Sequence, residues 1–221
     1  MSVSPLRQNL GRWLLAAFCT LVFAFLILPV VAIIPISFNS SSFLVFPQDG
    51  LSLRWYRVLA NSPVWMHALG NSLAVAAMTT IVAAPLGTLA AIGLRNLPSG
   101  AAPIMAALLS APMIIPVVVI AIALYFLFAP LGLANSFTGL VIAHTILALP
   151  FVVIVVHASL HGLDRDVVRA ALSLGAHPVQ VFVLVIAPLL APGIAAGAVF
   201  AFMTSFDETI VALFIAGPEY R

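Results

Sequence analysis

The sequence has few charged residues, a single cysteine and no lysine. Only 6% of its 221 residues are charged, whereas 64% are hydrophobic; a soluble domain carries about 25% charged residues. So few charges cannot cover a water-facing surface, which excludes an ordinary soluble protein and leaves apolar surface to face lipid. The eight basic residues are all arginine and the net charge is +2, which is too small and too dispersed for a nucleic-acid-binding surface.

The missing residue types also exclude several kinds of site. The chain has no lysine and therefore no Gly-x-x-x-x-Gly-Lys loop, so it cannot hydrolyse ATP by the P-loop mechanism. The single cysteine, Cys19, cannot form an intrachain disulfide. His157 and His161 have i, i+4 spacing, but Ala158 stands where zinc hydrolases of that spacing carry Glu. We expect no catalytic residue, no metal site and no cofactor bound by this chain.

Long windows without charge indicate membrane spans. They run between Arg12 and Asp49, Arg57 and Arg95, Arg95 and Asp164, and Arg169 and Asp207. A span needs about 20 apolar residues, and a charge at its centre costs roughly 2.5 to 3.5 kcal/mol. We predict an all-α, polytopic membrane bundle with spans at about 13–36, 72–94, 103–128, 137–156 and 188–206. Within the last span, Gly193 and Gly197 form a GxxxG pattern, which permits close approach of two helix backbones.

The arginines favour a cytoplasmic N-terminus. With that orientation the inner segments carry Arg7, Arg12, Arg95, Arg165 and Arg169, and the outer segments carry Arg54, Arg57 and Arg221. Cytoplasmic loops of membrane proteins carry an excess of lysine and arginine. Five arginines on the inner side against three on the outer side therefore support a cytoplasmic N-terminus. Trp55 and Tyr56 beside Arg54 and Arg57 suit the headgroup layer, and we expect a short interfacial helix there.

The polar segment from Asp164 to Pro188 interrupts the apolar pattern. It predicts a short polar-faced helix, a break at Gly175 and a second helix that leads back into the membrane. Ala170 and Ala171 beside this glycine form a compact knob, which a partner could grip with little loss of side-chain entropy. An ordinary cytoplasmic loop is the alternative interpretation.

The spacing within this segment resembles the EAA loop of permease subunits of binding-protein-dependent ABC importers. That pattern is Glu-Ala-Ala, three residues, Gly, nine residues, then Ile-x-Leu-Pro. Here Arg169-Ala170-Ala171 is followed at the same spacing by Gly175 and by Val185-Ile186-Ala187-Pro188. The residue types depart at Arg169, which replaces the acidic residue, and at Val185 and Ala187. Ser205-Phe-Asp-Glu208 and Ala216-Gly-Pro218 look most like the spermidine and putrescine branch of the family.

The resemblance implies a single transmembrane permease domain over 1–221 in the bacterial inner membrane, with a cytoplasmic EAA-type loop at 157–187. A cytoplasmic ATP-binding subunit would grip this loop through Arg169, Ala170, Ala171, Gly175 and Pro188. A second permease subunit, identical or different, would complete the pathway, and an outer solute-binding protein would deliver the substrate. Such permeases usually have six spans, so we interpret a last span as missing from this sequence.

The substrate is less constrained than the architecture. Asp207 and Glu208 form an adjacent acidic pair at the end of the last predicted span; they either line a path for a cation or only mark where the span stops. Polyamines are the expected substrate, with opines, aminophosphonates, iron or thiamine as alternatives. A membrane-embedded enzyme is a further alternative, for which Ser110 and His144 in different spans are a conceivable dyad.

Overall fold

The computed structural model describes residues 5–41 and 50–220 of the chain. Within these ranges every regular element is a helix, apart from an isolated bridge between Asn39 and Leu51. Four of the described helices are long and apolar enough to cross a membrane, and a bent helix pair raises the number to five. The prediction of an all-α membrane bundle with about five spans is thus confirmed.

The chain divides into two compact units, Met1–Met66 and His67–Arg221. The first unit contains α1 (Pro5–Ser37) and α2 (Arg54–Ala60). The Tyr56 hydroxyl lies 2.8 Å from the Ser37 hydroxyl, and the indole of Trp55 donates to the Ser41 carbonyl. The short helix expected beside the arginines is therefore present, and its aromatic residues hold it to the end of α1.

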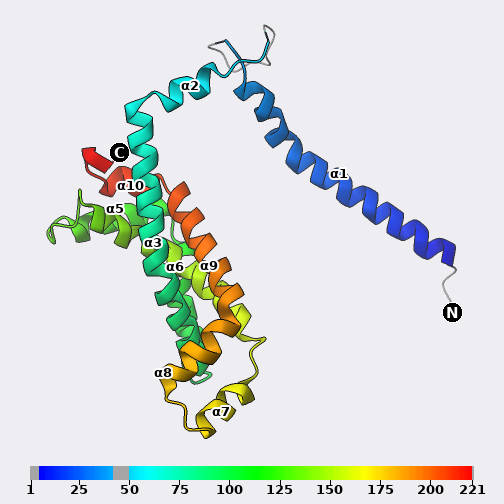
Figure 1. The fold of residues 1–221 in the computed structure, drawn as a ribbon, viewed down its shortest axis with the longest axis vertical. Helices are drawn as coiled ribbons and strands as arrows, with labels where there is room; N and C mark the ends of the chain where they lie inside the picture. Colours follow the sequence, from blue (N-terminus) through cyan, green and yellow to red (C-terminus); the bar gives the residue numbers. More distant parts are fainter. Residues whose placement is uncertain (1–4, 42–49, 221) are drawn as a thin grey trace. The chain divides into compact units, whose positions relative to one another are not determined.

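The second unit is built around α6 (Phe137–Leu160), the most buried of its long helices (Figure 1). The hydroxyl of Ser136 accepts from the Gly139 amide at 3.0 Å and so caps the start of α6. Helices α3 (Pro63–Asn96) and α9 (Ala187–Asp207) cover α6. Helix α3 begins nine residues before the span predicted at 72–94, because Pro63 is acceptable at a first helical position, where no amide donor is needed.

Glycines set how closely the covering helices approach α6. A Cβ added at Gly87 of α3 would lie 2.6 Å from the Cβ of Val152, and one at Gly193 of α9 would lie 2.6 Å from the Cβ of Ser159. Gly197 meets Val152 from the same side as Gly193. The GxxxG pattern is therefore a true packing surface, in which the missing side chains let helix backbones come close.

The segment at 103–128, which we expected as one span, consists of two helices joined at a sharp bend. Helix α4 (Ala101–Ile114) and α5 (Val117–Phe128) are bent by 101° at the break between them. The residue before a proline is pushed out of the helical region, and Ile115 accordingly has ψ 133° before Pro116. The bend at Pro116 falls inside the predicted span, and the helix pair forms either one broken span or a re-entrant loop.

The segment predicted as the loop 157–187 is largely helical. Residues 157–160 belong to α6, and α7 (Arg165–Ser173) follows after a short turn. Helix α8 (Pro178–Val181) continues through a π-helical segment, η1 (Phe182–Ile186), into α9. The chain then forms α10 (Ile210–Ile215) and the 3-10 turn η2 (Pro218–Tyr220).

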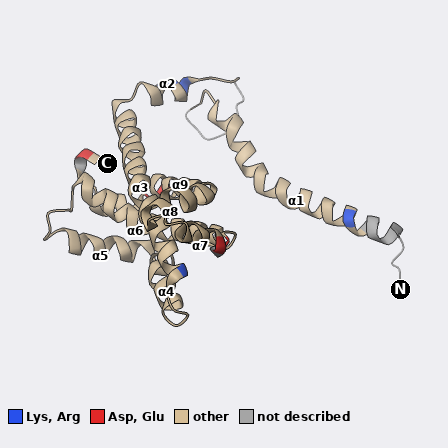
Figure 2. Ribbon diagram, turned by 60° about the horizontal axis from the view of Figure 1, so that its bottom comes forward, with Lys and Arg blue, Asp and Glu red and all other residues tan. Residues whose placement is uncertain are grey.

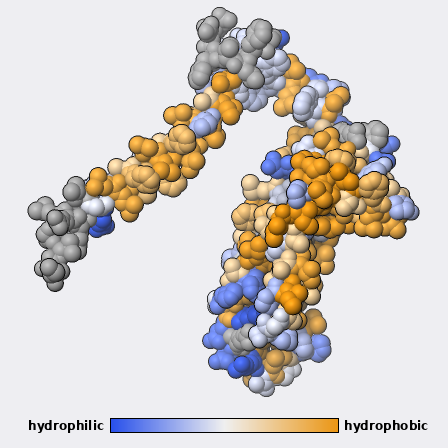
Figure 3. All heavy atoms as spheres, turned by 180° about the vertical axis from the view of Figure 1, so that it is seen from behind, coloured by the Kyte–Doolittle hydropathy of each residue, from blue (hydrophilic) through white to orange (hydrophobic). Residues whose placement is uncertain are grey.

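Polar residues gather at one end of the second unit. Figure 3 shows hydrophilic surface at the end that holds α7 and α8, and mainly hydrophobic surface along the rest of the bundle. Figure 2 shows how few charged residues the ribbon carries, with acidic residues on α7. This division is what a membrane requires, because charged groups are stable only outside the hydrocarbon layer.

Candidate functional site

Helix α7 is started by a local cap. The Asp164 carboxylate accepts from the Asp166 amide at 2.9 Å, immediately before the first turn of α7. Asp166 also pairs with Arg169 at 3.3 Å, with both side chains well exposed. Carboxylates at a helix N-terminus satisfy unpaired amides and complement the helix dipole. The nine-residue helix is thus specified by its own polar residues.

Gly175 ends α7 in a left-handed conformation. Its φ is +84°, its amide donates to the Leu172 carbonyl at 3.0 Å, and the Ala176 amide donates to the Ala171 carbonyl at 3.2 Å. This pair of bonds is the Schellman arrangement, in which glycine is favoured because other residues are strained there. A Cβ at Gly175 would meet no atom within 4 Å. Backbone conformation, rather than crowding, therefore requires glycine at this position of the motif.

The knob that we expected beside Gly175 is exposed and partly apolar. Ala170 and Gly175 are exposed and Ala171 is partly buried. Leu174 at the tip is 88% exposed. Arg169 differs from its neighbours, since it lines a cavity against the rest of the bundle together with Val168. Ala170 lies about 200° around α7 from Val168, on the opposite face.

The return into the membrane begins with a second local cap. The His177 amide donates to the Gln180 side chain at 2.9 Å, and the His177 ring accepts from the Val179 amide at 3.4 Å. Pro188 occupies the first turn of α9, directly after the π-helical segment. A proline has no amide and its ring crowds the carbonyl four residues earlier, so a local widening of the helix before it relieves that contact. Pro188 thus marks a change in helical winding that the motif did not reveal.

Arg95 is a residue that the sequence did not single out for this site. Its guanidinium donates to the Leu163 carbonyl at 2.7 Å, one residue before the Asp164 cap of α7. Arg95 lies in the last turn of α3, so this bond ties the end of α3 to the start of α7. A lone arginine at a helix end carries no sequence signal for such a contact, because 68 residues separate the two partners.

The acidic pair lies at the opposite end of α9. Asp207 is the last residue of α9 and is exposed, whereas Glu208 is half-buried. The Glu208 carboxylate accepts from the amides of Ile210 and Val211 at 2.8 and 3.0 Å. Glu208 therefore caps α10, whose Val211 and Ile215 are fully buried. The two acids have different surroundings: Glu208 is engaged by the backbone, and Asp207 is open.

A hollow of about 470 Å³ lies beside this pair. It is lined by Phe202, Met203, Thr204, Phe206, Asp207 and Glu208. The rings of Phe202 and Phe206 stack with centroids 5.9 Å apart and planes 9° apart. Aromatic faces and carboxylates both attract cations, so this hollow suits a cationic solute with an apolar stem. The i, i+4 spacing of the two phenylalanines was visible in the sequence as a shared helix face.

His144 is an interior residue that links α6 to α9. Its Nδ1 lies 2.9 Å from the hydroxyl of Ser205, and both side chains are 3% exposed. The partner of His144 is therefore Ser205 rather than Ser110, the partner considered for an enzymatic dyad. Ser110 lines a different cavity, together with His157. Because both side chains are buried, we interpret the bond as a packing contact between α6 and α9.

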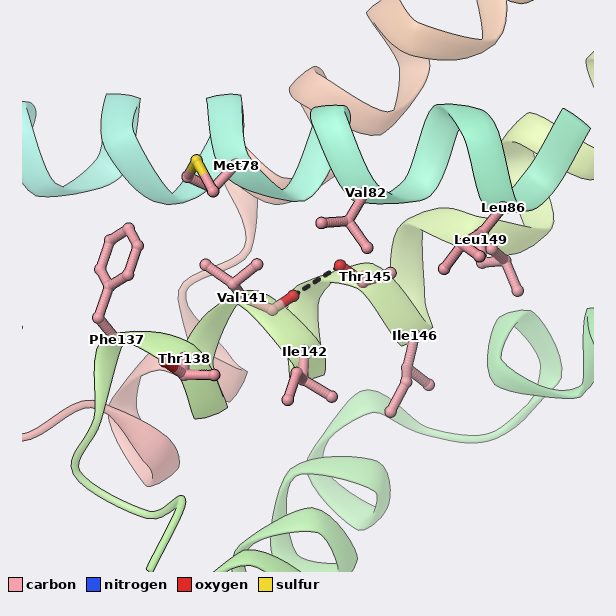
Figure 4. A pocket seen from close by; sticks show the side chains of 10 residues that line it. All are labelled: Met78, Val82, Leu86, Phe137, Thr138, Val141, Ile142, Thr145, Ile146 and Leu149. Atoms are coloured by element: carbon pink, nitrogen blue, oxygen red, sulfur yellow. Dashed lines mark hydrogen bonds between the residues drawn. The ribbon is translucent and has the colours of Figure 1, made fainter.

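A cavity of about 520 Å³ between α3 and α6 is apolar (Figure 4). Thr138 and Thr145 are its only polar lining residues, and the Thr145 hydroxyl donates to the Val141 carbonyl of its own helix at 2.7 Å. The lining therefore offers little to a hydrophilic solute.

Comparison with known proteins identifies the family. The family described as binding-protein-dependent transport system inner membrane component matches residues 83–219. The spermidine/putrescine transport system permease protein PotC of Escherichia coli is 36% identical over 212 residues, which cover 96% of this chain and 80% of PotC. The putrescine transport system permease protein PotI of the same species is 35% identical, over 89% of this chain and 72% of PotI. PotC of Haemophilus influenzae is 30% identical, over 93% and 79%.

These matches confirm the resemblance drawn from the EAA spacing, and they extend it over nearly the whole chain. They also exclude the enzyme alternative, since the relatives are transport subunits. The chain therefore belongs to the inner-membrane components of binding-protein-dependent transport systems, as a permease subunit of an ATP-driven importer.

Proposed function

We propose that this permease subunit imports polyamines of the spermidine and putrescine type. The observation that carries the proposal is the hollow at the end of α9, in which exposed Asp207 lies beside the stacked pair of Phe202 and Phe206. A polyamine is a chain of methylenes with ammonium groups, so carboxylate and aromatic faces match its two parts. The names of the relatives PotC and PotI support the same substrate class.

The coupling surface is the exposed face of α7 and its tip. Ala170, Ala171, Leu174 and Gly175 dock in a groove of a cytoplasmic ATP-binding subunit, and Leu174 is the apolar anchor. The 88% exposure of Leu174 supports this role, because an exposed apolar tip is stabilised when a partner covers it. Pro188 fixes where the attached helix enters the bundle. Movement of the knob is then transmitted to α9, which carries Asp207 at its other end.

The docking role has a direct test in Ala171→Asp. A charge placed in a close-packed socket costs several kcal/mol when it stays unpaired, so we expect loss of co-purification with the ATP-binding subunit and loss of transport. Asn61→Asp adds the same charge at an exposed residue outside α7 and serves as the control. Normal co-purification and transport in Ala171→Asp would reject the docking surface.

In the proposed orientation the N-terminus and α7 are cytoplasmic, and the end of α9 with Asp207 lies toward the outer side. A second permease subunit completes the path, and a solute-binding protein delivers the polyamine from outside. Labelling an introduced cysteine tests the orientation in a Cys19→Ser background, which has no other thiol. We expect Asp166→Cys to be protected from an impermeant reagent in intact cells and Glu219→Cys to be labelled; the reverse pattern would overturn the orientation.

Uptake measurements test the substrate. Cells that lack their own polyamine importers would express this chain with its ATP-binding subunit, second permease and binding protein. We expect uptake of labelled spermidine and putrescine that requires the chain and is competed by unlabelled polyamine. If the cells instead take up an opine, an aminophosphonate, iron or thiamine and no polyamine, the substrate assignment would be wrong. The assignment as a permease subunit would not change.

A further inference from the structure

A small cavity with two arginines lies where α3, α6, α7 and η1 converge. It has a volume of about 220 Å³. Arg95, Asn96 and Arg169 contribute its polar lining, and Leu160, Leu163 and Ile186 contribute to its apolar lining. None of the lining residues is acidic. The cavity therefore combines two positively charged side chains with several apolar lining residues.

We propose that this cavity holds the phosphate of an anionic phospholipid from the cytoplasmic leaflet. The inference rests on the orientation given with the proposed function, which places α7 on the cytoplasmic side. Basic pockets between membrane helices on that side attract anionic headgroups, and guanidinium groups bind phosphate through paired donors. The apolar lining residues match the first acyl carbons of a lipid, which free phosphate does not have.

The geometry keeps one of the arginines in place. The bond from Arg95 to the Leu163 carbonyl, 2.7 Å long, fixes this guanidinium at the cavity before any ligand arrives. Among the described residues, Arg169 is held by the exposed pair with Asp166 at 3.3 Å, and exposed pairs of this kind are weak. The Arg169 guanidinium can therefore release the Asp166 carboxylate and bind a phosphate instead. The Asp166 carboxylate and the phosphate then compete for the same guanidinium.

The site also accounts for the departure at Arg169 from the family's acidic residue. Val168 and Arg169 line the cavity, whereas Ala170 lies on the opposite face of α7. A lipid in the cavity would contact the end of α3 and α7 together and would stabilise the position of the docking knob. Of the proposed docking residues, Ala170 faces away from the cavity, and a carboxylate from the ATP-binding subunit is the alternative occupant that the test separates from a lipid.

Native mass spectrometry of the full chain in detergent tests the proposal. Phosphatidylglycerol, phosphatidylcholine and inorganic phosphate would be titrated separately. We expect preferential retention of phosphatidylglycerol, reduced about fivefold in Arg169→Gln, the usual effect of one cationic side chain at an anionic membrane surface. Arg169→Glu should abolish the preference, and Asp166→Asn should raise it by removing the competing carboxylate.

The control is Arg57→Gln, which removes the same charge from α2, outside the cavity. Equal losses in Arg57→Gln and Arg169→Gln would show general attraction to basic interfaces and would overturn the site. Binding of inorganic phosphate without preference for phosphatidylglycerol would also overturn it, with free phosphate as the occupant. Unchanged lipid retention in Arg169→Gln together with lost co-purification of the ATP-binding subunit would reject the lipid in favour of a protein carboxylate. Because lipid retention is measured without transport, failure of the polyamine assignment is a separate result.

Discussion

The two ends of α9 are stabilised in different ways. Helix α9 has 21 residues, a length of about 30 Å. Before its first turn the chain is shaped by local bonds, such as the Schellman pair at Gly175 and the cap at His177. At its last turn Ser205 pairs with His144 on α6, and Glu208 caps α10 through the amides of Ile210 and Val211. The end proposed for coupling is thus shaped mostly by bonds between neighbours, with the Arg95 bond to the Leu163 carbonyl as a long-range tie, whereas the Ser205–His144 bond joins the acidic end to α6.

The largest effect is expected from Gly175→Pro, which disrupts the locally bonded turn between α7 and α8. Proline fixes φ near −65°, against +84° at this position, and it removes the amide that bonds to Leu172. We expect transport to fall to background while the protein still inserts, as measured by uptake and by membrane protein level. Asn tolerates the left-handed region, so Gly175→Asn should retain most transport. Normal transport in Gly175→Pro would mean that the shape of the knob is unimportant.

Asp207→Asn tests the exposed acidic residue at the C-terminal end of α9. We expect roughly tenfold lower polyamine uptake, because a carboxylate in a partly shielded hollow attracts an ammonium group and desolvation offsets much of that attraction. Protein level and basal ATP hydrolysis of the assembled complex should not change. Glu219→Gln is the matched control, since it removes one exposed acid from outside the hollow. Equal uptake by the Asp207 and Glu219 variants would mean that Asp207 only marks the end of the helix.

Two substitutions of Glu208 test the role of its charge and its role as a helix cap separately. Glu208→Gln keeps an oxygen that accepts from the Ile210 and Val211 amides, whereas Glu208→Ala removes the cap. Loss of such a cap costs about 1 to 2 kcal/mol, so we expect a lower thermal midpoint for Glu208→Ala and a nearly normal one for Glu208→Gln. Polyamine uptake by Glu208→Gln then reports the charge alone. A normal midpoint in Glu208→Ala would show that α10 is held by packing without this cap.

The smallest effect is expected from Ser205→Ala. Hydrogen bonds between membrane helices contribute about 0.6 kcal/mol on average, so thermal stability should fall only slightly and uptake should be retained. Ser159→Ala, which removes a hydroxyl bonded within its own helix, provides the control. A large loss of uptake with unchanged stability would contradict the interpretation of the His144 contact as packing.

Much of the coupling end was readable from the sequence because its bonds join neighbours. Asp164 before a polar helix, a glycine after it and a proline at the next helix start each act within a few residues. The EAA spacing placed these features in order, and the exposed knob followed from them. The π-helical segment before Pro188 was missed, because it depends on how the helix relieves crowding by the proline ring.

The sequence by itself determined that this chain is a helical membrane protein, since long charge-free windows leave no other stable state for the backbone. It also determined the short polar-faced helix and the break at Gly175 that follows it. Only the tertiary structure decided that His144 pairs with Ser205 and that Arg95 reaches the start of α7. The physical reason is that these contacts join residues far apart in the chain, whose meeting depends on how the helices pack.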